Sequence, residues 1–299
     1  MHLTIGVFGN ADFMKKVAKQ GTTNDLMIYN HGSSEGVFTY VAPNSESIQP
    51  LLQTVNLADV PLIVADEVTK ELAEQIIALD AFGFEKGLVL SASEDLRRII
   101  KGTSVEKFVW VSDERECLET LKQYSPLRLV DIVWIPIDNY FTVKSVGTVV
   151  LAVMKGGTIK KYDKLTIAPI GKEVMIKGIQ SQDKDIDEAS AGMRIGLSLK
   201  GVEADEFKRG YVICKDAAVS KNVTIEFVKS KYSKESVVAG SQMFLCVGLR
   251  VVVGKVESLE GNVLALSLEQ PIAYFPKQRC LLASTQPALP RIVGAGTMQ

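Results

Sequence analysis

The sequence predicts a multidomain protein in which an α/β domain with a doubly wound sheet is followed by two antiparallel β-barrels. Strand and helix signals alternate over residues 1–125. Short segments rich in β-branched residues, separated by glycine or lysine turns, fill residues 126–217, and a second all-β stretch fills residues 218–299. We expect these ranges to be three domains, and 299 residues with 46% hydrophobic content are enough for two or three domains with cores.

The alternation of strands and helices in the first domain predicts a mostly parallel sheet. Ligands of such sheets bind beyond the carboxyl ends of the strands, so functional residues are sought there. We expect strands at residues 4–8, 26–29, 37–41, 62–65, 87–90 and 107–111, and helices at residues 12–19, 47–54, 68–79, 94–100 and 114–124.

The other two domains read as small barrels with short strands. In the second domain, Gly156 and Gly157 are expected to form a hairpin turn, and Gly171 another. We assign these glycines structural roles and no binding role. Strands are expected at residues 148–153, 164–167 and 174–179, and in the third domain at residues 223–228, 242–247, 249–256, 263–268 and 278–284, with a turn at 260–262.

Residues 9–16, which follow the first strand, match part of the phosphate-binding loop G-x-x-x-x-G-K-[ST]. Gly9 and Lys15 occupy the places of the first glycine and the lysine. Met14 replaces the second glycine, which lets backbone amides face phosphate, and Lys16 replaces the hydroxyl residue that ligates magnesium. Taken alone, so partial a match is also typical of an ordinary strand-to-helix turn.

Segments further along the chain resemble a known family. Val-Gly-Thr-Val-Val at 146–150, Gly-Gly-Thr-Ile-Lys at 156–160 and Ala-Gly-Met-Arg-Ile-Gly-Leu at 191–197 are similar to the second domain of translational GTPases of the elongation factor Tu and SelB type. Residues 248–251, 266–272 and 291–296 resemble the third domain of SelB and of the gamma subunit of initiation factor two. SelB, the selenocysteine-specific elongation factor, has a further C-terminal domain, which we expect to be absent here.

The resemblance implies that the first domain is a degenerate nucleotide-binding domain. The family's magnesium-linked D-x-P-G turn corresponds to residues 41–44, where Pro43 remains but Val41 and Asn44 replace the aspartate and the glycine. Ser45 stands where the family has the histidine that positions the attacking water. We therefore expect no metal ligand and no catalytic residue at these positions.

The family's guanine-selecting motif N-K-x-D corresponds to residues 91–94. Ser91 replaces the asparagine, and only Glu94 keeps an acidic side chain, one methylene longer than aspartate. In the switch region, residues 21–25, Thr22 or Thr23 still offers a hydroxyl. Losing phosphate, metal and base contacts together should abolish tight nucleotide binding, because polar atoms of the ligand would be buried without partners.

Charge divides the chain in two. Residues 1–125 contain 11 Lys and Arg against 18 Asp and Glu, a net charge of −7, whereas residues 126–299 contain 23 against 17, a net charge of +6. An acidic domain without metal ligands is a poor host for a triphosphate, and the mildly basic barrels could favour RNA or an acidic protein surface. The lysines at 160–161 and 229–234 are more typical of a solvated surface than of a nucleic-acid site.

Other features limit the class of protein. Four widely spaced cysteines predict free buried thiols rather than a zinc site or disulfides, and two histidines give no catalytic set. The absence of a span-length apolar stretch or signal-like N-terminus predicts a cytoplasmic protein without a membrane partner, and we expect no DNA partner.

Three functions remain open. The favoured one is a binding or scaffold protein for tRNA, the ribosome or another translation component, with no cofactor and no GTP switch. The second is a divergent GTP-binding elongation factor that holds GTP and Mg²⁺ weakly and delivers aminoacyl-tRNA. The third is a regulatory protein that competes with an authentic factor for a partner and carries no RNA.

Overall fold

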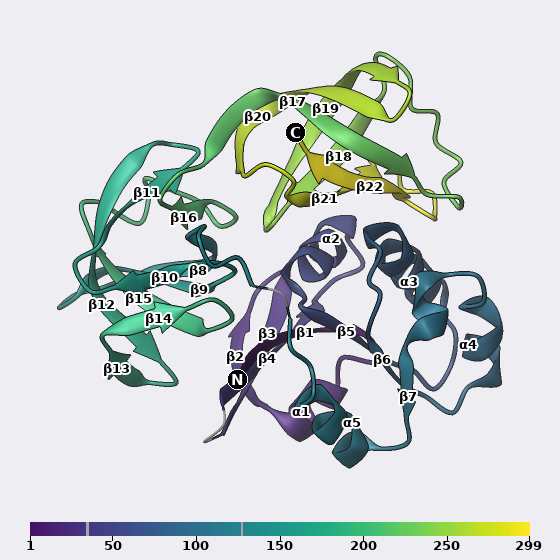
Figure 1. The fold of residues 1–299 in the computed structure, drawn as a ribbon, viewed down its shortest axis with the longest axis horizontal. Helices are drawn as coiled ribbons and strands as arrows, with labels where there is room; N and C mark the ends of the chain where they lie inside the picture. The colour runs from purple at the N-terminus through teal and green to yellow at the C-terminus, as the bar shows by residue number, and fades with distance from the viewer. Residues whose placement is uncertain (34–35, 127) are drawn as a thin grey trace.

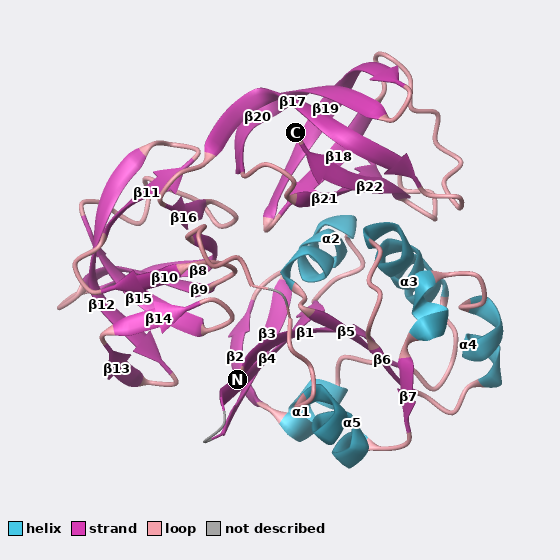
Figure 2. Ribbon diagram, in the orientation of Figure 1, coloured by secondary structure: helices cyan, strands magenta, loops and turns pink. Residues whose placement is uncertain are grey.

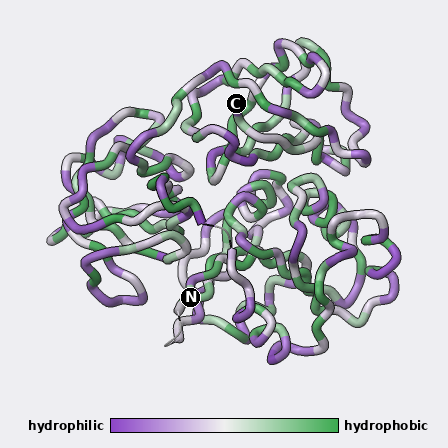
Figure 3. The backbone as a smooth tube through the Cα atoms, viewed as in Figure 1, coloured by the Kyte–Doolittle hydropathy of each residue, from purple (hydrophilic) through white to green (hydrophobic). Residues whose placement is uncertain are grey.

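The computed structural model describes residues 1–33, 36–126 and 128–299, which form three lobes (Figure 1). An α/β lobe runs from β1 to α5, a middle barrel from β8 to β16, and a C-terminal barrel from β17 to β22. Among the described residues all helices belong to the α/β lobe (Figure 2). Hydrophobic stretches of chain run through each lobe (Figure 3). The predicted fold class is confirmed.

The sheet of the α/β lobe has the order β2-β3-β4-β1-β5-β6-β7. The five neighbouring strands β4, β1, β5, β6 and β7 are parallel to one another. At the β4 edge, β3 pairs antiparallel with β4 and β2 pairs antiparallel with β3. The sheet is therefore mostly parallel, as predicted. The strands are β1 (His2–Gly9), β2 (Lys19–Thr23), β3 (Leu26–Ser33), β4 (Gly36–Pro43), β5 (Val60–Val64), β6 (Leu88–Leu90) and β7 (Val109–Val111).

Helices cover both faces of this sheet. Side chains of α1 and α5 form one core against it, and side chains of α2, α3 and α4 form another, as expected for a doubly wound domain. The helices are α1 (Phe13–Val17), α2 (Ile48–Leu57), α3 (Lys70–Phe82), α4 (Glu94–Ile99), α5 (Glu114–Leu121) and the short 3₁₀ helix Ser104–Lys107. None of the helices that the structure describes is long and apolar enough to cross a membrane.

Two details of the α/β lobe differ from the prediction. The helix expected at residues 12–19 is only the five-residue α1, because Ala18 is already extended and β2 begins at Lys19. Strand β2 was not predicted, because most of its side chains are exposed and it lacks an alternating apolar pattern.

The middle barrel closes when β11 pairs with both β16 and β12. Gly171 lies in the turn between the antiparallel strands β11 and β12, as predicted. The hairpin predicted at Gly156 and Gly157 is wrong: Gly157 does have a positive φ of 74°, but β9 and β10 lie in different sheets. The strands are β8 (Trp134–Val143), β9 (Gly147–Val153), β10 (Thr158–Lys160), β11 (Lys164–Ala168), β12 (Lys172–Ser181), β13 (Lys184–Ile186), β14 (Glu188–Ser190), β15 (Arg194–Lys200) and β16 (Val212–Cys214).

The C-terminal barrel is a closed ring of order β17-β20-β19-β18-β21-β22. The predicted turn at residues 260–262 joins β19 to β20, and the segment at 291–296 overlaps the closing strand. The four cysteines are free and buried, as predicted. The strands are β17 (Ala218–Lys229), β18 (Gln242–Val247), β19 (Arg250–Glu260), β20 (Val263–Tyr274), β21 (Arg279–Ser284) and β22 (Ile292–Met298).

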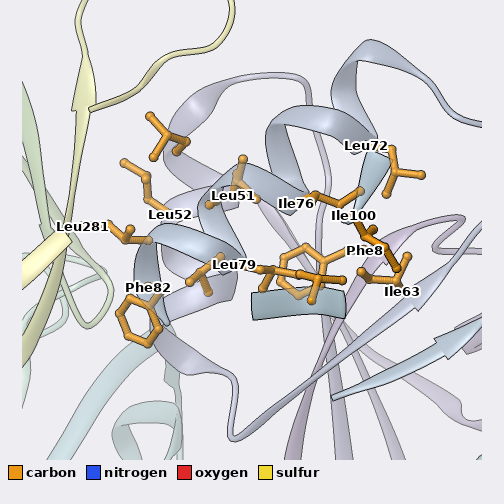
Figure 4. Close-up of a cluster of buried hydrophobic side chains, with 14 of the residues drawn as sticks. Phe8, Leu51, Leu52, Ile63, Leu72, Ile76, Leu79, Phe82, Ile100 and Leu281 are labelled. Atoms are coloured by element: carbon orange, nitrogen blue, oxygen red, sulfur yellow. The ribbon is translucent and has the colours of Figure 1, made fainter. Parts of the chain in front are cut away.

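One hydrophobic core joins the α/β lobe to the C-terminal barrel. Leu52 and Leu79 from the helices pack in the same buried cluster as Leu281 from the barrel (Figure 4). Cys246, Ala283, Ile292 and Ala295 add further barrel side chains to this cluster. Separating these lobes would therefore expose apolar surface, which is unfavourable at roughly 25 cal/mol per Å².

Candidate functional site

The backbone amides of the turn between β1 and α1 donate hydrogen bonds to other groups of the protein. Gly9 donates its N–H to Oε1 of Gln75 on α3 at 2.7 Å, and Asn10 donates its N–H to the carbonyl oxygen of Val64 at 2.7 Å. The N–H of Asp12 is bound by the side-chain oxygen of Asn10 at 3.0 Å. A phosphate-binding loop needs amides that point at the ligand, and these three point at protein acceptors.

Gly9 has a structural reason to be glycine. Its φ is +81°, and a Cβ built on it would lie 2.3 Å from the carbonyl oxygen of Val64. Close packing of the turn against β5 therefore requires glycine here, with or without a phosphate.

The other three positions of the loop are also engaged. Met14, a residue of α1, is 0% exposed and packs in the core between this helix and the sheet. Nζ of Lys15 lies 2.6 Å from Oδ1 of Asp12, and this hydrogen bond raises the pKa of Lys15. Nζ of Lys16 lies 3.1 Å from Oε1 of Glu114 on α5. The two lysines thus pair with different carboxylates and do not converge on one point.

The residues at the place of the magnesium turn are tied to a neighbouring loop. Val41 is buried in β4, and Pro43 is the last residue of that strand. Asn44 donates its backbone N–H to the carbonyl of Asp25 at 2.9 Å and its side-chain amide to the carbonyl of Asn24 at 2.6 Å. Residues 41–44 offer no carboxylate to a metal, and Asn44 is held by two hydrogen bonds to the loop at residues 24–25.

Ser45 and Thr22 point to protein partners. Oγ of Ser45 accepts the backbone N–H of Ser47 at 3.4 Å, at the start of α2. Oγ1 of Thr22 accepts a hydrogen bond from Nη2 of Arg194 in the middle barrel at 3.4 Å. The structure therefore separates Thr22 from the phosphate-loop remnant by turning it toward the second lobe.

The loops after β6 and β7 satisfy their own amides. Oγ of Ser91 accepts the N–H of Ser93 at 3.1 Å. Glu94, with its side chain 78% exposed, pairs with Arg97 at 3.5 Å on the same helix. After β7, the carboxylate of Glu116 accepts both the N–H and the hydroxyl of Ser112 at 2.7 Å, and these hydrogen bonds lower its pKa.

The vestigial positions are thus distributed around the carboxyl edge of the sheet, but they form no common binding set. Within the described part of the chain, no group of three or more His, Cys, Asp or Glu is placed to hold a metal ion. What the arrangement can do is fix loops against helices and against the middle barrel.

The polar contacts that hold the lobes together were not predicted. The carboxylate of Asp59, 5% exposed at its side chain, lies 2.6 Å from Nζ of Lys155 and 2.9 Å from Nη1 of Arg128. Burial opposes ionisation of Asp59, but the two cations outweigh it and lower its pKa. These partners lie far apart along the chain, so no local pattern predicts them.

A second contact joins α3 to the C-terminal barrel. Glu74 has a side chain 3% exposed, and its carboxylate binds Nη2 of Arg291 at 2.5 Å and Nε at 3.1 Å. It also accepts the backbone N–H of Arg291 at 2.6 Å. A glutamate on an otherwise apolar helix face, between Leu72 and Ile76, is the one sequence signal that could have pointed to a buried partner.

All three lobes meet at Arg209 and Gln53. Arg209, from the middle barrel, binds Oδ2 of Asp25 at 2.8 Å and Oε1 of Gln53 at 2.9 Å in the α/β lobe. The amide of Gln53 then donates to the carbonyl of Leu249 in the C-terminal barrel at 2.8 Å. This chain of hydrogen bonds fixes the relative positions of the lobes.

Comparisons with known proteins match this architecture. The family model described as elongation factor Tu domain 2 matches residues 147–214. The chain is 35% identical to Uncharacterized protein MJ0325 of Methanocaldococcus jannaschii, over 99% of both chains. It is 27% identical to the selenocysteine-specific elongation factor of the same organism, over 87% of this chain and 63% of that protein.

Among solved structures, translation elongation factor SelB from Methanococcus maripaludis, in complex with the GTP analogue GppNHp, matches with a TM-score of 0.85. That match has 22% identity and covers 100% of this chain and 79% of the other.

Proposed function

We propose that this chain, which belongs to the translational GTPase family close to SelB and elongation factor Tu, works without a nucleotide switch. Its role is that of a binding or scaffold protein for tRNA, the ribosome or another translation component. The single observation that carries the proposal is the hydrogen bonding of the β1–α1 turn.

To bind a triphosphate, that turn would have to break internal hydrogen bonds. Releasing the Gly9 and Asn10 amides removes two bonds to protein acceptors, each with a net contribution of about 1 kcal/mol. Contacts to the metal and to the base would have to offset this loss. Val41 and Ser91 lack the side chains that make those contacts in the family. Nucleotide binding is therefore unfavourable at the phosphates and weakly supported elsewhere.

The way the lobes are joined supports a fixed arrangement. In switching GTPases, the γ-phosphate and Mg²⁺ order two loops, and the domains move when these loops are released. Here Val41 lies in a buried cluster with Leu249 of the C-terminal barrel, and side-chain contacts join the lobes. A rigid three-lobe body suits a scaffold that presents one surface to its partner.

The charge distribution supports a partner on the barrels. Residues 126–299 carry a net charge of +6 against −7 for residues 1–125. An RNA partner would contact the basic part and avoid the acidic lobe. Two of the proteins named above, the selenocysteine-specific elongation factor and SelB, are elongation factors, which makes tRNA and the ribosome the first partners to test.

Recovery of bound RNA and protein from native cells, followed by gel-shift titration with tRNA at two salt concentrations, tests this role. An RNA-binding scaffold loses affinity as salt rises, because phosphate contacts release counterions. Recovery of a translation-factor protein without RNA, and no shift with tRNA, would instead favour the competing regulator. Co-recovery of GTP with aminoacyl-tRNA would favour the divergent elongation factor, for which the exposed Lys15 occupies the place of the family's loop lysine.

A further inference from the structure

A cleft of about 360 Å³ opens where the three lobes meet, away from the edge of the sheet described above. Clefts of this size at domain interfaces are common small-molecule sites. Each lobe contributes side chains to its wall: Asn56 and Phe82 from the α/β lobe, Trp134 and Lys155 from the middle barrel, and Phe275 and Arg279 from the C-terminal barrel.

The cleft carries more positive than negative charge. Arg128 and Lys155 share the single carboxylate of Asp59, at 2.9 and 2.6 Å. Arg279 is an exposed residue whose guanidinium lies 4.6 Å from the centroid of the Phe82 ring. Among the residues that the structure describes, no carboxylate lies within ion-pair distance of Arg279, but the negative charge of Glu85 also acts on it. The described lining residues provide three cations and one carboxylate. With Glu85, which also acts on Arg279, two carboxylates oppose three cations, and an anion would balance the one positive charge that remains.

Apart from Asn56 and Gln278, the side chains of the rest of the wall are apolar or aromatic. The rings of Trp134 and Phe275 pack edge to face, with centroids 5.1 Å apart and an interplanar angle of 83°. Phe82 and Pro136 extend this wall. Such a surface gives a flat ring both apolar contact and favourable edge-to-face geometry.

We infer that the cleft binds a small organic anion, with its charged group at Arg279 and its planar ring against the half-buried Phe275, whose own ring packs on the buried Trp134. The charged group is a phosphate or a carboxylate, because a guanidinium can bind either in a bidentate manner. A ligand here touches all three lobes and stabilises their assembled arrangement by mass action. The inference does not depend on whether the chain binds GTP.

The test uses the full chain and two pairs of probes, followed by thermal unfolding and isothermal calorimetry. Adenosine 5′-monophosphate and indole-3-acetate each carry a ring and an anion, whereas adenosine lacks the anion and inorganic phosphate lacks the ring. We expect a ring-bearing anion to raise the Tm saturably and to do so more than either partial probe. Phenyl phosphate and benzoate, which share one ring, then identify phosphate or carboxylate as the charged group by which of the two binds more tightly.

Variants assign the binding to the cleft. Arg279→Gln should weaken the active probe by about tenfold or more, and Arg279→Lys by less. Arg98→Gln, which removes an exposed cation on α4, serves as the matched control and should leave binding unchanged. Should Arg279→Gln fail to fold, Phe275→Leu decides, since it removes a ring from the wall and should also weaken binding.

Two results would overturn the inference. One is the absence of any Tm increase with either ring-bearing anion up to about 10 mM. The other is equal affinity in the wild type and in whichever of Arg279→Gln and Phe275→Leu folds, which would place the binding elsewhere.

Discussion

Gly9 and Gln75, 66 residues apart, are joined by a hydrogen bond of 2.7 Å from the backbone N–H of the glycine to the side-chain oxygen of the glutamine. This bond ties α3 to the turn that resembles a phosphate-binding loop. The turn that most resembles a nucleotide site is therefore also a structural contact between β1 and α3.

Removing this acceptor should lower stability without creating a nucleotide site. Gln75→Ala leaves the Gly9 amide without its partner, and we expect a loss of about 0.5–1.5 kcal/mol in the free energy of unfolding by urea. Gln123→Ala, at an exposed glutamine after α5, is the control and should stay within about 0.5 kcal/mol of the wild type. Equal stability of the two variants would show that the bond contributes nothing.

Restoring the loop residues should not restore hydrolysis. We expect no GTP turnover from Met14→Gly combined with Lys16→Thr, because Val41, Ser45 and Ser91 remain unsuited to metal, water and base. Met14→Gly also empties a buried position, which should lower stability by about 2–5 kcal/mol. Lys16→Thr alone loses one exposed ion pair and should cost less than about 1 kcal/mol.

Phosphate release by the double variant in the presence of Mg²⁺, measured at a temperature where the variant is folded, checks this expectation. Turnover above the uncatalysed background would mean that the correspondence between residues 9–16 and the phosphate loop has been assigned wrongly.

The pair of Glu74 and Arg291 should matter far more than a surface pair. Arg291→Ala leaves the buried Glu74 carboxylate without its cation, so we expect a loss of about 3–5 kcal/mol in urea unfolding. Replacing both residues by leucine should cost less than Arg291→Ala, because no charge is then left buried.

Lys172→Ala, which breaks the exposed pair with Glu206, is the comparison and should cost less than about 1 kcal/mol. A loss of that small size for Arg291→Ala would show that Glu74 and Arg291 do not hold the lobes together.

Asp59 should make stability dependent on pH in the acid range. Its folded-state pKa lies below the unfolded value, so the unfolded chain binds the proton first as the pH falls. The stabilisation is fully present above the unfolded pKa of about 3.9 and is lost as the pH falls through the folded pKa.

Asp59→Asn should therefore be less stable than the wild type near neutral pH, with a difference that narrows as the pH falls below about 4. Urea unfolding of both proteins across this range gives the comparison. If the difference in unfolding free energy between the two proteins stays constant with pH, ionisation of Asp59 is not the source of the pH dependence.

The fold was largely predictable because apolar strands and amphipathic helices repeat along the first lobe and β-branched strands along the barrels. Strand β2 was not predictable, since its exposed side chains carry no apolar pattern. Gly156 and Gly157 suggested a hairpin because glycine pairs usually turn between neighbouring strands, but here the chain leaves one sheet for another.

For the candidate site, the sequence predicted only which residues of the family's nucleotide-binding motifs are replaced in this chain. Met14 and Val41 could be recognised as replacements from the sequence, and their burial now gives each a packing role. The partner of the Gly9 amide could not be foreseen, because Gln75 reaches it only after the chain has folded. That the substitutions abolish nucleotide binding stays a prediction.

Titration of the purified chain with a fluorescent guanine nucleotide and Mg²⁺ tests the central claim most directly. With SelB as the positive control, we expect no saturable binding up to about 1 mM nucleotide, because the loop amides are already bound inside the protein. Micromolar, Mg²⁺-dependent binding that Lys15→Ala weakens would contradict the claim and identify the chain as a GTP-binding factor.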